Sequence, residues 1–198
     1  MSLRFLPTAI AGVIQIEPEV FRDPRGFFLE TFHAGKYAAG GVATAFVQDN
    51  HSSSVKDTLR GLHLQWHKPQ GKLVRVVRGE IWDVAVDIRR DSATFGRWTA
   101  ATLSADNFRQ LYLPPGCAHG FCVLSDVAEV QYKCTELYDA KDEVGIAYND
   151  PALAIPWPVK DPILSARDQG HGTLQQLLER ADRGELAMHR ATEAMESR

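Results

Sequence analysis

Short runs of alternating apolar and polar residues make up most of this chain, and glycine or proline residues separate the runs. The clearest runs cover residues 73–77, 80–88, 97–103 and 110–113, and they are rich in β-branched and aromatic residues. A period of two is typical of strands that bury one face. Several short strands at regular spacing indicate a sandwich, barrel or jelly roll. The pattern therefore predicts an all-β fold.

Helical periodicity is expected in two places. Residues 32–39 predict a short helical turn, and residues 173–195 predict a helix with a break at Gly184. In the second segment, Thr173 and Gln176 have the spacing of a capping box. One face of this segment carries an apolar stripe formed by Leu174, Leu177, Leu178 and Ala181. We expect the segment to serve packing or an oligomer contact.

Composition narrows the class of protein. The 198 residues, 44% of them hydrophobic, are enough for one core, so we expect a single domain over residues 1–172 and a helical tail over residues 173–198. A net charge of −3 without a basic run speaks against a nucleic-acid partner. No apolar run approaches the roughly 20 residues that span a bilayer. Three cysteines without a CxxC pair are typical of a reducing compartment, so we expect a cytoplasmic protein with no membrane partner.

Candidate chemistry is concentrated in two adjacent strand-like segments, residues 59–65 and 70–75. By parity, His63 and Gln65 share one face of the first segment, and Arg60 has the opposite parity. A hairpin return would place Lys72 of the second segment near His63. Histidine changes charge near neutral pH, so it suits proton removal, and nearby cations suit a substrate that becomes negatively charged.

Metal binding is the rival use of His63 and His119. Metal-binding barrels of the cupin type use a His-x-His pair, and here the second position is Gln65. An amide is a poor ligand for a transition metal beside imidazole, and Lys72 would add a positive charge next to the ion. We therefore expect no metal.

Two tyrosines and two polar segments complete the candidates. Tyr132 and Tyr138 have equal parity, so an extended segment would turn both to one side, either as a general acid or as core aromatics. Arg25 lies in a turn between aromatic positions, which suits a phosphate and a stacked base. Residues 48–52 carry amides that suit the edge of a pyrimidine base.

Together these segments resemble the dTDP-4-dehydrorhamnose 3,5-epimerase family between about residues 21 and 168. The matching motifs lie at residues 21–28, 48–52, 59–63, 70–75, 83–89, 94–98, 103–107, 118–121, 149–151 and 164–168. The resemblance implies a cupin-type double-stranded β-helix jelly roll, here followed by a C-terminal helical segment. It also implies a metal-independent and cofactor-independent epimerase of dTDP-4-keto-6-deoxy sugars, most simply a dTDP-4-dehydrorhamnose 3,5-epimerase.

The resemblance assigns roles to four residues. It implies that His63 removes a proton next to the ketone, with Asp168 orienting the ring, as in other His–Asp pairs. Lys72 would stabilise the enolate oxygen, and Tyr132 would return a proton to the opposite face.

The same resemblance implies a binding shell and an assembly. The shell consists of Phe21, Arg25, Glu30, Gln48, Asp49, Asn50, Arg60, His119, Tyr138, Glu143 and Arg167. Arg60 is expected on the diphosphate. The family pattern also implies a homodimer that exchanges N-terminal strands, so that Phe21, Arg25 and Glu30 complete the site of the partner subunit.

Departures from the family pattern leave alternatives open. Arg167 stands where lysine is usual, Tyr148 replaces a common tryptophan, and the helical tail is not covered by the pattern. The alternatives are a mono-epimerase acting at C3 or C5, a 3,4-ketoisomerase on the same fold, a metal-dependent cupin oxygenase, and a sugar-nucleotide binding module without catalysis.

Overall fold

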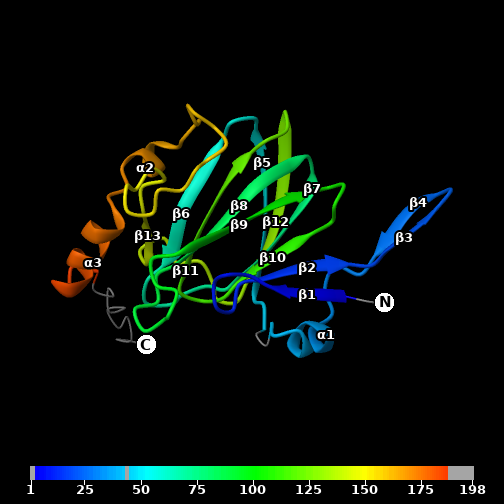
Figure 1. Cartoon of the computed structure of the whole chain (residues 1–198), viewed down its shortest axis with the longest axis horizontal. Helices are drawn as coiled ribbons and strands as arrows, with labels where there is room; N and C mark the ends of the chain where they lie inside the picture. Colours follow the sequence, from blue (N-terminus) through cyan, green and yellow to red (C-terminus); the bar gives the residue numbers. More distant parts are fainter. Residues whose placement is uncertain (1–2, 43–44, 187–198) are drawn as a thin grey trace, which may run out of the picture.

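Two antiparallel sheets packed face to face form the body of the protein (Figure 1). The computed structural model describes residues 3–42 and 45–186. The six-stranded sheet runs in the order β1 (Leu3–Pro7), β2 (Ile14–Pro18), β10 (Gln110–Leu113), β7 (Lys72–Arg78), β12 (Val127–Cys134) and β5 (Gln48–Val55). The five-stranded sheet runs in the order β13 (Glu143–Gly145), β6 (Leu59–Gln65), β11 (Cys117–Val123), β8 (Glu80–Asp87) and β9 (Trp98–Ser104). This arrangement confirms the predicted all-β jelly roll.

The alternating residues of the strands divide between two cores. The first core lies between the sheets and includes Val74, Ile81 and Leu111. The second core lies on the outer face of the five-stranded sheet, where Leu62 and Val84 pack among others against the C-terminal segment. The five-stranded sheet is therefore buried on both faces, which holds the side chains between the sheets in place.

Three helices lie within the described residues: α1 (Ala34–Ala39), α2 (Ala166–Gln169) and α3 (Leu174–Asp182). The first confirms the helical turn predicted over residues 32–39. The third begins with the predicted capping box of Thr173 and Gln176, and its Leu174 and Leu177 are buried in the second core. The helix ends at Asp182, ahead of Gly184 with φ +71°, as the predicted break requires. Residues 187–198 of the predicted tail lie outside the described residues.

A separate hairpin, β3 (Val20–Asp23) and β4 (Gly26–Leu29), extends away from the two sheets (Figure 1). Phe21 and Phe28 face each other across it, with exposed fractions of 43% and 60%. Large aromatic side chains are seldom left exposed together without a partner surface.

No helix of the described residues is long and apolar enough to span a membrane.

Candidate active site

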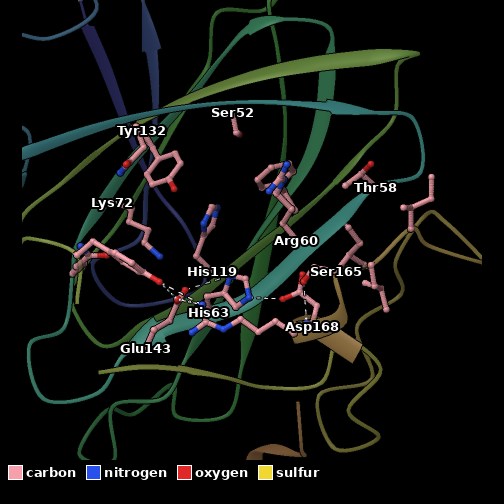
Figure 2. A pocket seen from close by; sticks show the side chains of 18 of the residues that line it. Ser52, Thr58, Arg60, His63, Lys72, His119, Tyr132, Glu143, Ser165 and Asp168 are labelled. Carbon is pink, nitrogen blue, oxygen red and sulfur yellow. Dashed lines mark hydrogen bonds and ion pairs between the residues drawn. The ribbon is translucent and has the colours of Figure 1, made fainter. Parts of the chain in front are cut away.

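A cavity of about 630 Å³ opens between the sheets. Its walls come from β5, β6, β7, β11 and β12, together with residues 163–168. It brings together eleven of the predicted site residues: His63, Tyr132, Asp168, Lys72, Gln48, Asn50, Arg60, His119, Tyr138, Glu143 and Arg167. Figure 2 labels seven of them, and they reach the cavity from segments that are far apart in the sequence.

His63 and Asp168 form a direct hydrogen-bonded pair at the wall of the cavity. His63 Nε2 lies 2.5 Å from Asp168 Oδ1, and Nδ1 lies on the side of Glu143, whose Oε1 is 3.8 Å away. Asp168 belongs to α2, which Ser165 caps by accepting a hydrogen bond from the Asp168 amide. Burial alone would raise the pKa of Asp168, but the neighbouring His171 and His63 rings outweigh it and hold that pKa well below its usual range. Asp168 is therefore ionised, and it directs a proton onto Nε2 and leaves Nδ1 as the basic nitrogen.

Arg60 lies on the same face as His63, so the parity argument was wrong here. The β6–β11 register pairs His63 with His119 but Arg60 with Phe121, so β6 contains one extra residue. Gly61 lies at this bulge with φ +111°, and a Cβ on it would lie 2.6 Å from the Gly120 Cα. An extra residue reverses the alternation of a strand, which brings the guanidinium to the cavity.

Lys72 and Tyr132 face the cavity from the other sheet. The predicted hairpin return was wrong, because β6 belongs to the five-stranded sheet and β7 to the six-stranded sheet. Lys72 therefore reaches the cavity from the wall opposite the strand of His63. Burial lowers the pKa of Lys72 and raises the pKa of Tyr132. The phenol therefore keeps its proton at neutral pH.

Tyr138, Glu143 and Arg167 form a polar cluster at the rim of the cavity. The Tyr138 hydroxyl donates to Glu143 Oε2 at 2.7 Å, and Arg167 forms an ion pair with Glu143 and donates to the Tyr138 oxygen at 3.4 Å. Strand β12 ends at Cys134, so the condition that the segment stays extended through Tyr138 is not met. The loop nevertheless carries Tyr138 to the same cavity as Tyr132.

Strand β5 divides the predicted polar segment between its two faces. Gln48 and Asn50 line the cavity. Asp49 points away from it and pairs with Lys133 at 3.0 Å, so the structure does not place Asp49 in the cavity of its own chain. His119 is buried at the cavity wall, with Nε2 2.7 Å from Asp83 Oδ1.

Three predicted residues lie on or beside the projecting hairpin instead of in the cavity. Arg25 pairs with Asp23, and Glu30 pairs with Lys36 at 2.7 Å. Phe21, Arg25 and other hairpin residues line a separate surface hollow. None of Phe21, Arg25 and Glu30 lines the cavity of this chain.

The side chains at the cavity are poorly suited to hold a metal ion. The Gln65 side chain does not line the cavity: its amide donates to the Lys68 and Leu137 carbonyls and accepts from the Asp139 amide. Among the described residues, one group of potential ligands converges, formed by His63, Asp168 and His171. Zinc would hold such atoms about 2.0–2.2 Å from itself and therefore more than 3 Å apart. The 2.5 Å contact between His63 and Asp168 is instead the length of a short hydrogen bond.

His171 is the neighbour that the sequence analysis missed. Its Nε2 lies 3.5 Å from Asp168 Oδ1, and its ring packs against that of His63 with centroids 5.4 Å apart. The sequence could have indicated His171 by its position three residues after Asp168, because that spacing puts two side chains on one side of a helical turn.

Comparison with known proteins identifies the family. The model of the dTDP-4-dehydrorhamnose 3,5-epimerase family matches residues 7–176 of this chain. The chain belongs to this family. A relative of that name from Methanothermobacter thermautotrophicus is 51% identical over 178 residues, which are 88% of this chain and 96% of the relative. The predicted family, and with it the epimerase class of enzyme, is confirmed.

Two further family members are informative. The crystal structure of the dTDP-6-deoxy-D-glucose-3,5-epimerase from Legionella pneumophila, in complex with dTDP-4-keto-L-rhamnose, superimposes with a TM-score of 0.85. It is 47% identical, with 88% of this chain and 94% of that chain covered. A dTDP-4-dehydrorhamnose 3-epimerase from Streptomyces niveus is 43% identical over 169 residues, which are 84% of this chain and 82% of the relative.

Proposed function

We propose that this family member inverts the two carbons next to the ketone of dTDP-4-dehydro-6-deoxyglucose, giving dTDP-4-dehydrorhamnose. The observation that carries the proposal is that a base and an acid reach one cavity from different sheets. His63 comes from the five-stranded sheet, and Tyr132 comes from the six-stranded sheet. Inversion of a carbon requires removal of a proton from one face and delivery to the other, which groups on opposing walls can do.

The proton transfers follow from the contacts of each group. His63 takes the proton from the carbon next to the ketone, and Asp168, 2.5 Å from its ring, stabilises the imidazolium. The electron pair of the broken C–H bond moves onto the carbonyl oxygen, where Lys72 stabilises the enolate. Tyr132 gives its hydroxyl proton to the opposite face of the carbon. Exchange with water then restores the phenol and the neutral imidazole.

The charges of the cavity suit a sugar diphosphate. Asp168 is engaged with His63 and Glu143 with Arg167, and in the described part of the chain Arg60 and Lys72 have no carboxylate partner. Arg60 donates from Nε to Ser54 at 3.0 Å, which leaves the terminal nitrogens for the diphosphate. Gln48 and Asn50 on β5 are assigned to the nucleotide.

We further propose that the enzyme is a homodimer in which each hairpin completes the partner's cavity. The exposed phenylalanines of β3 and β4, and the position of Arg25 and Glu30 outside the cavity of their own chain, support this assembly.

Deuterium incorporation tests the reaction. In D₂O, we expect the wild-type protein to place deuterium at both C3 and C5 of dTDP-4-dehydro-6-deoxyglucose. NMR measures this incorporation. His63→Ala is expected to lose 10²-fold or more of this exchange, since a positioned base contributes about 10²–10⁴ in rate. Absence of exchange with wild type, or full exchange by the variant, would contradict the proposal.

A mono-epimerase is the second candidate, because the Streptomyces niveus relative is named a 3-epimerase at 43% identity. The same experiment separates the two functions. One deuterium per product, at C3 or C5 alone, would replace the double epimerase with the single one.

A further inference from the structure

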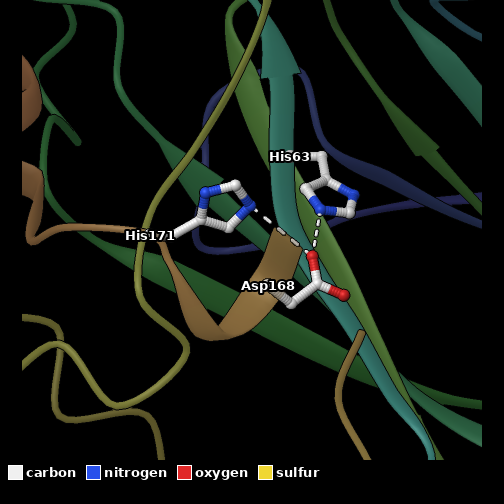
Figure 3. A group of neighbouring side chains, drawn as sticks. All are labelled: His63, Asp168 and His171. Carbon is white, nitrogen blue, oxygen red and sulfur yellow. Dashed lines mark hydrogen bonds and ion pairs between the residues drawn. The ribbon is translucent and has the colours of Figure 1, made fainter. Parts of the chain in front are cut away.

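One oxygen of Asp168 faces two histidines, and the proposed reaction uses one of them. Figure 3 shows His63 and His171 on either side of the carboxylate. Both Nε2 atoms approach Oδ1, at 2.5 Å from His63 and 3.5 Å from His171. The two rings stand nearly at right angles, with an interplanar angle of 82°, and both present Nε2 to the same oxygen.

His171 occupies a niche that the backbone leaves open. Gly145 is the β13 residue paired with His63 of β6, and a Cβ on it would lie 2.2 Å from His171 Nε2. The Ala147 amide donates to the Gly172 carbonyl at 2.7 Å, which fixes the chain next to His171. The ring is thus inserted beside the base, with its side chain only 12% exposed.

The buried nitrogen of His171 has one acceptor within reach. Its Nε2 is shielded from solvent and has no hydrogen-bond partner that meets the usual geometry among the described residues. A separation of 3.5 Å is at the outer limit of a hydrogen bond. An N–H dipole or charge still acts strongly on a carboxylate in a buried setting, where the effective dielectric constant is low.

We propose that His171 is a positioning residue, which shares the Asp168 oxygen with His63 and limits how strongly the carboxylate stabilises the protonated base. This role rests on the proposed function of His63. A carboxylate with two donors divides its negative charge between them. Without His171, all of that charge acts on His63, so its proton is held more tightly and the base is free only at higher pH.

The other charged groups around His63 and Asp168 stay the same when His171 is substituted. Glu143 lies 3.8 Å from His63 and is paired with Arg167. The remaining titratable groups that line the cavity are Arg60 on β6, Lys72 on β7, His119 on β11 with its partner Asp83, Tyr132 on β12, and Tyr138. A difference between wild type and a His171 variant therefore reports on His171.

The test follows the titration of the His63 ring C–H signal by NMR in protein without substrate. His171→Phe fills the niche without a donor, and Gly145→Ala displaces the ring while His171 is retained. We expect both to move the His63 midpoint up by about 0.5 to 1 pH unit, and the acid limb of kcat/KM to move by the same amount. His171→Gln keeps an N–H near the position of Nε2 and is expected to stay close to wild type.

Unchanged midpoints in folded His171→Phe and Gly145→Ala would overturn the role of His171, as would a downward shift. If one variant fails to fold, the other decides. Because the titration needs no turnover, it is read independently of the proposed function. Wild type without deuterium exchange would refute the epimerase. The His63 midpoint in the two variants decides on the role of His171 alone: an upward shift supports it, and an unchanged or lower midpoint refutes it.

Discussion

Lys72 combines a functional gain with a structural cost. Its ammonium lies at the cavity wall, burial lowers its pKa, and within the described residues no carboxylate pairs with it. A buried charge without a partner destabilises a fold, whereas an enolate oxygen in the same place would be strongly stabilised by it. This balance supports the proposed role of Lys72, which is to stabilise the negative charge that develops on the enolate oxygen.

Lys72→Met should separate these two effects. We expect deuterium exchange into the substrate to fall about 10²–10³-fold, while the free energy of unfolding stays equal or rises. Because the folded-state pKa of Lys72 is lowered, the unfolded state binds more protons. Wild-type stability relative to the variant should therefore increase as the pH is raised toward about 10.4.

Urea unfolding at several pH values and NMR exchange measure the two effects. A variant that is less stable at neutral pH and exchanges at the wild-type rate would contradict both expectations.

At the level of elements, the bulge in β6 decides the composition of the site. It puts Arg60 and His63 on one face of one strand, where regular alternation would separate them. The backbone of β11 passes so close to Gly61 that a Cβ there would also lie 2.6 Å from the His119 carbonyl oxygen.

Gly61→Ala is expected to cost about 1–3 kcal/mol of stability, from left-handed backbone and overpacking together, and to lower deuterium exchange at least tenfold by displacing Arg60 and His63. Gly96→Ala is the matched control. Gly96 also has positive φ, at +72°, but nothing lies within 4 Å of its Cβ position. It should lose about 1 kcal/mol and keep full exchange. Equal effects of the two substitutions, by urea unfolding and NMR, would show that the close approach is unimportant.

At the scale of the whole molecule, the exposed β3–β4 hairpin is a feature that the fold of a single chain does not explain. It projects from the sheets (Figure 1), and its Phe21, Phe27 and Phe28 are exposed. The burial of apolar surface is the main force in association, so this face is where a second copy would bind.

Phe28→Ser tests the assembly. We expect wild type to sediment as a dimer of the 22.0 kDa chain, and the variant to shift toward monomer and lose exchange activity together, because its hairpin no longer completes the partner's cavity. Phe95→Ser, at a 36% exposed phenylalanine of the body, should leave both unchanged. A wild-type monomer with full exchange would refute the dimer.

Sequence reasoning was reliable for local features and for identity. Period-two alternation predicted the strands, and the capping box at Thr173 was predicted from spacing alone, since both depend on near neighbours in the chain. The motifs between residues 21 and 168 predicted the family that the comparison confirmed. Parity failed at Arg60, because one extra residue in β6 inverts every side chain before it.

The sequence by itself determined the strand content, the family and the residue types available for acid–base chemistry. The resemblance implied that Asp168, Lys72 and Tyr132 act together with His63, but only the tertiary structure decided how they meet. It brought Asp168 to His63 across 105 residues, placed Lys72 and Tyr132 on the opposite sheet, and inserted His171 beside the carboxylate. Such contacts depend on sheet register and on the packing of distant segments, which no local pattern encodes.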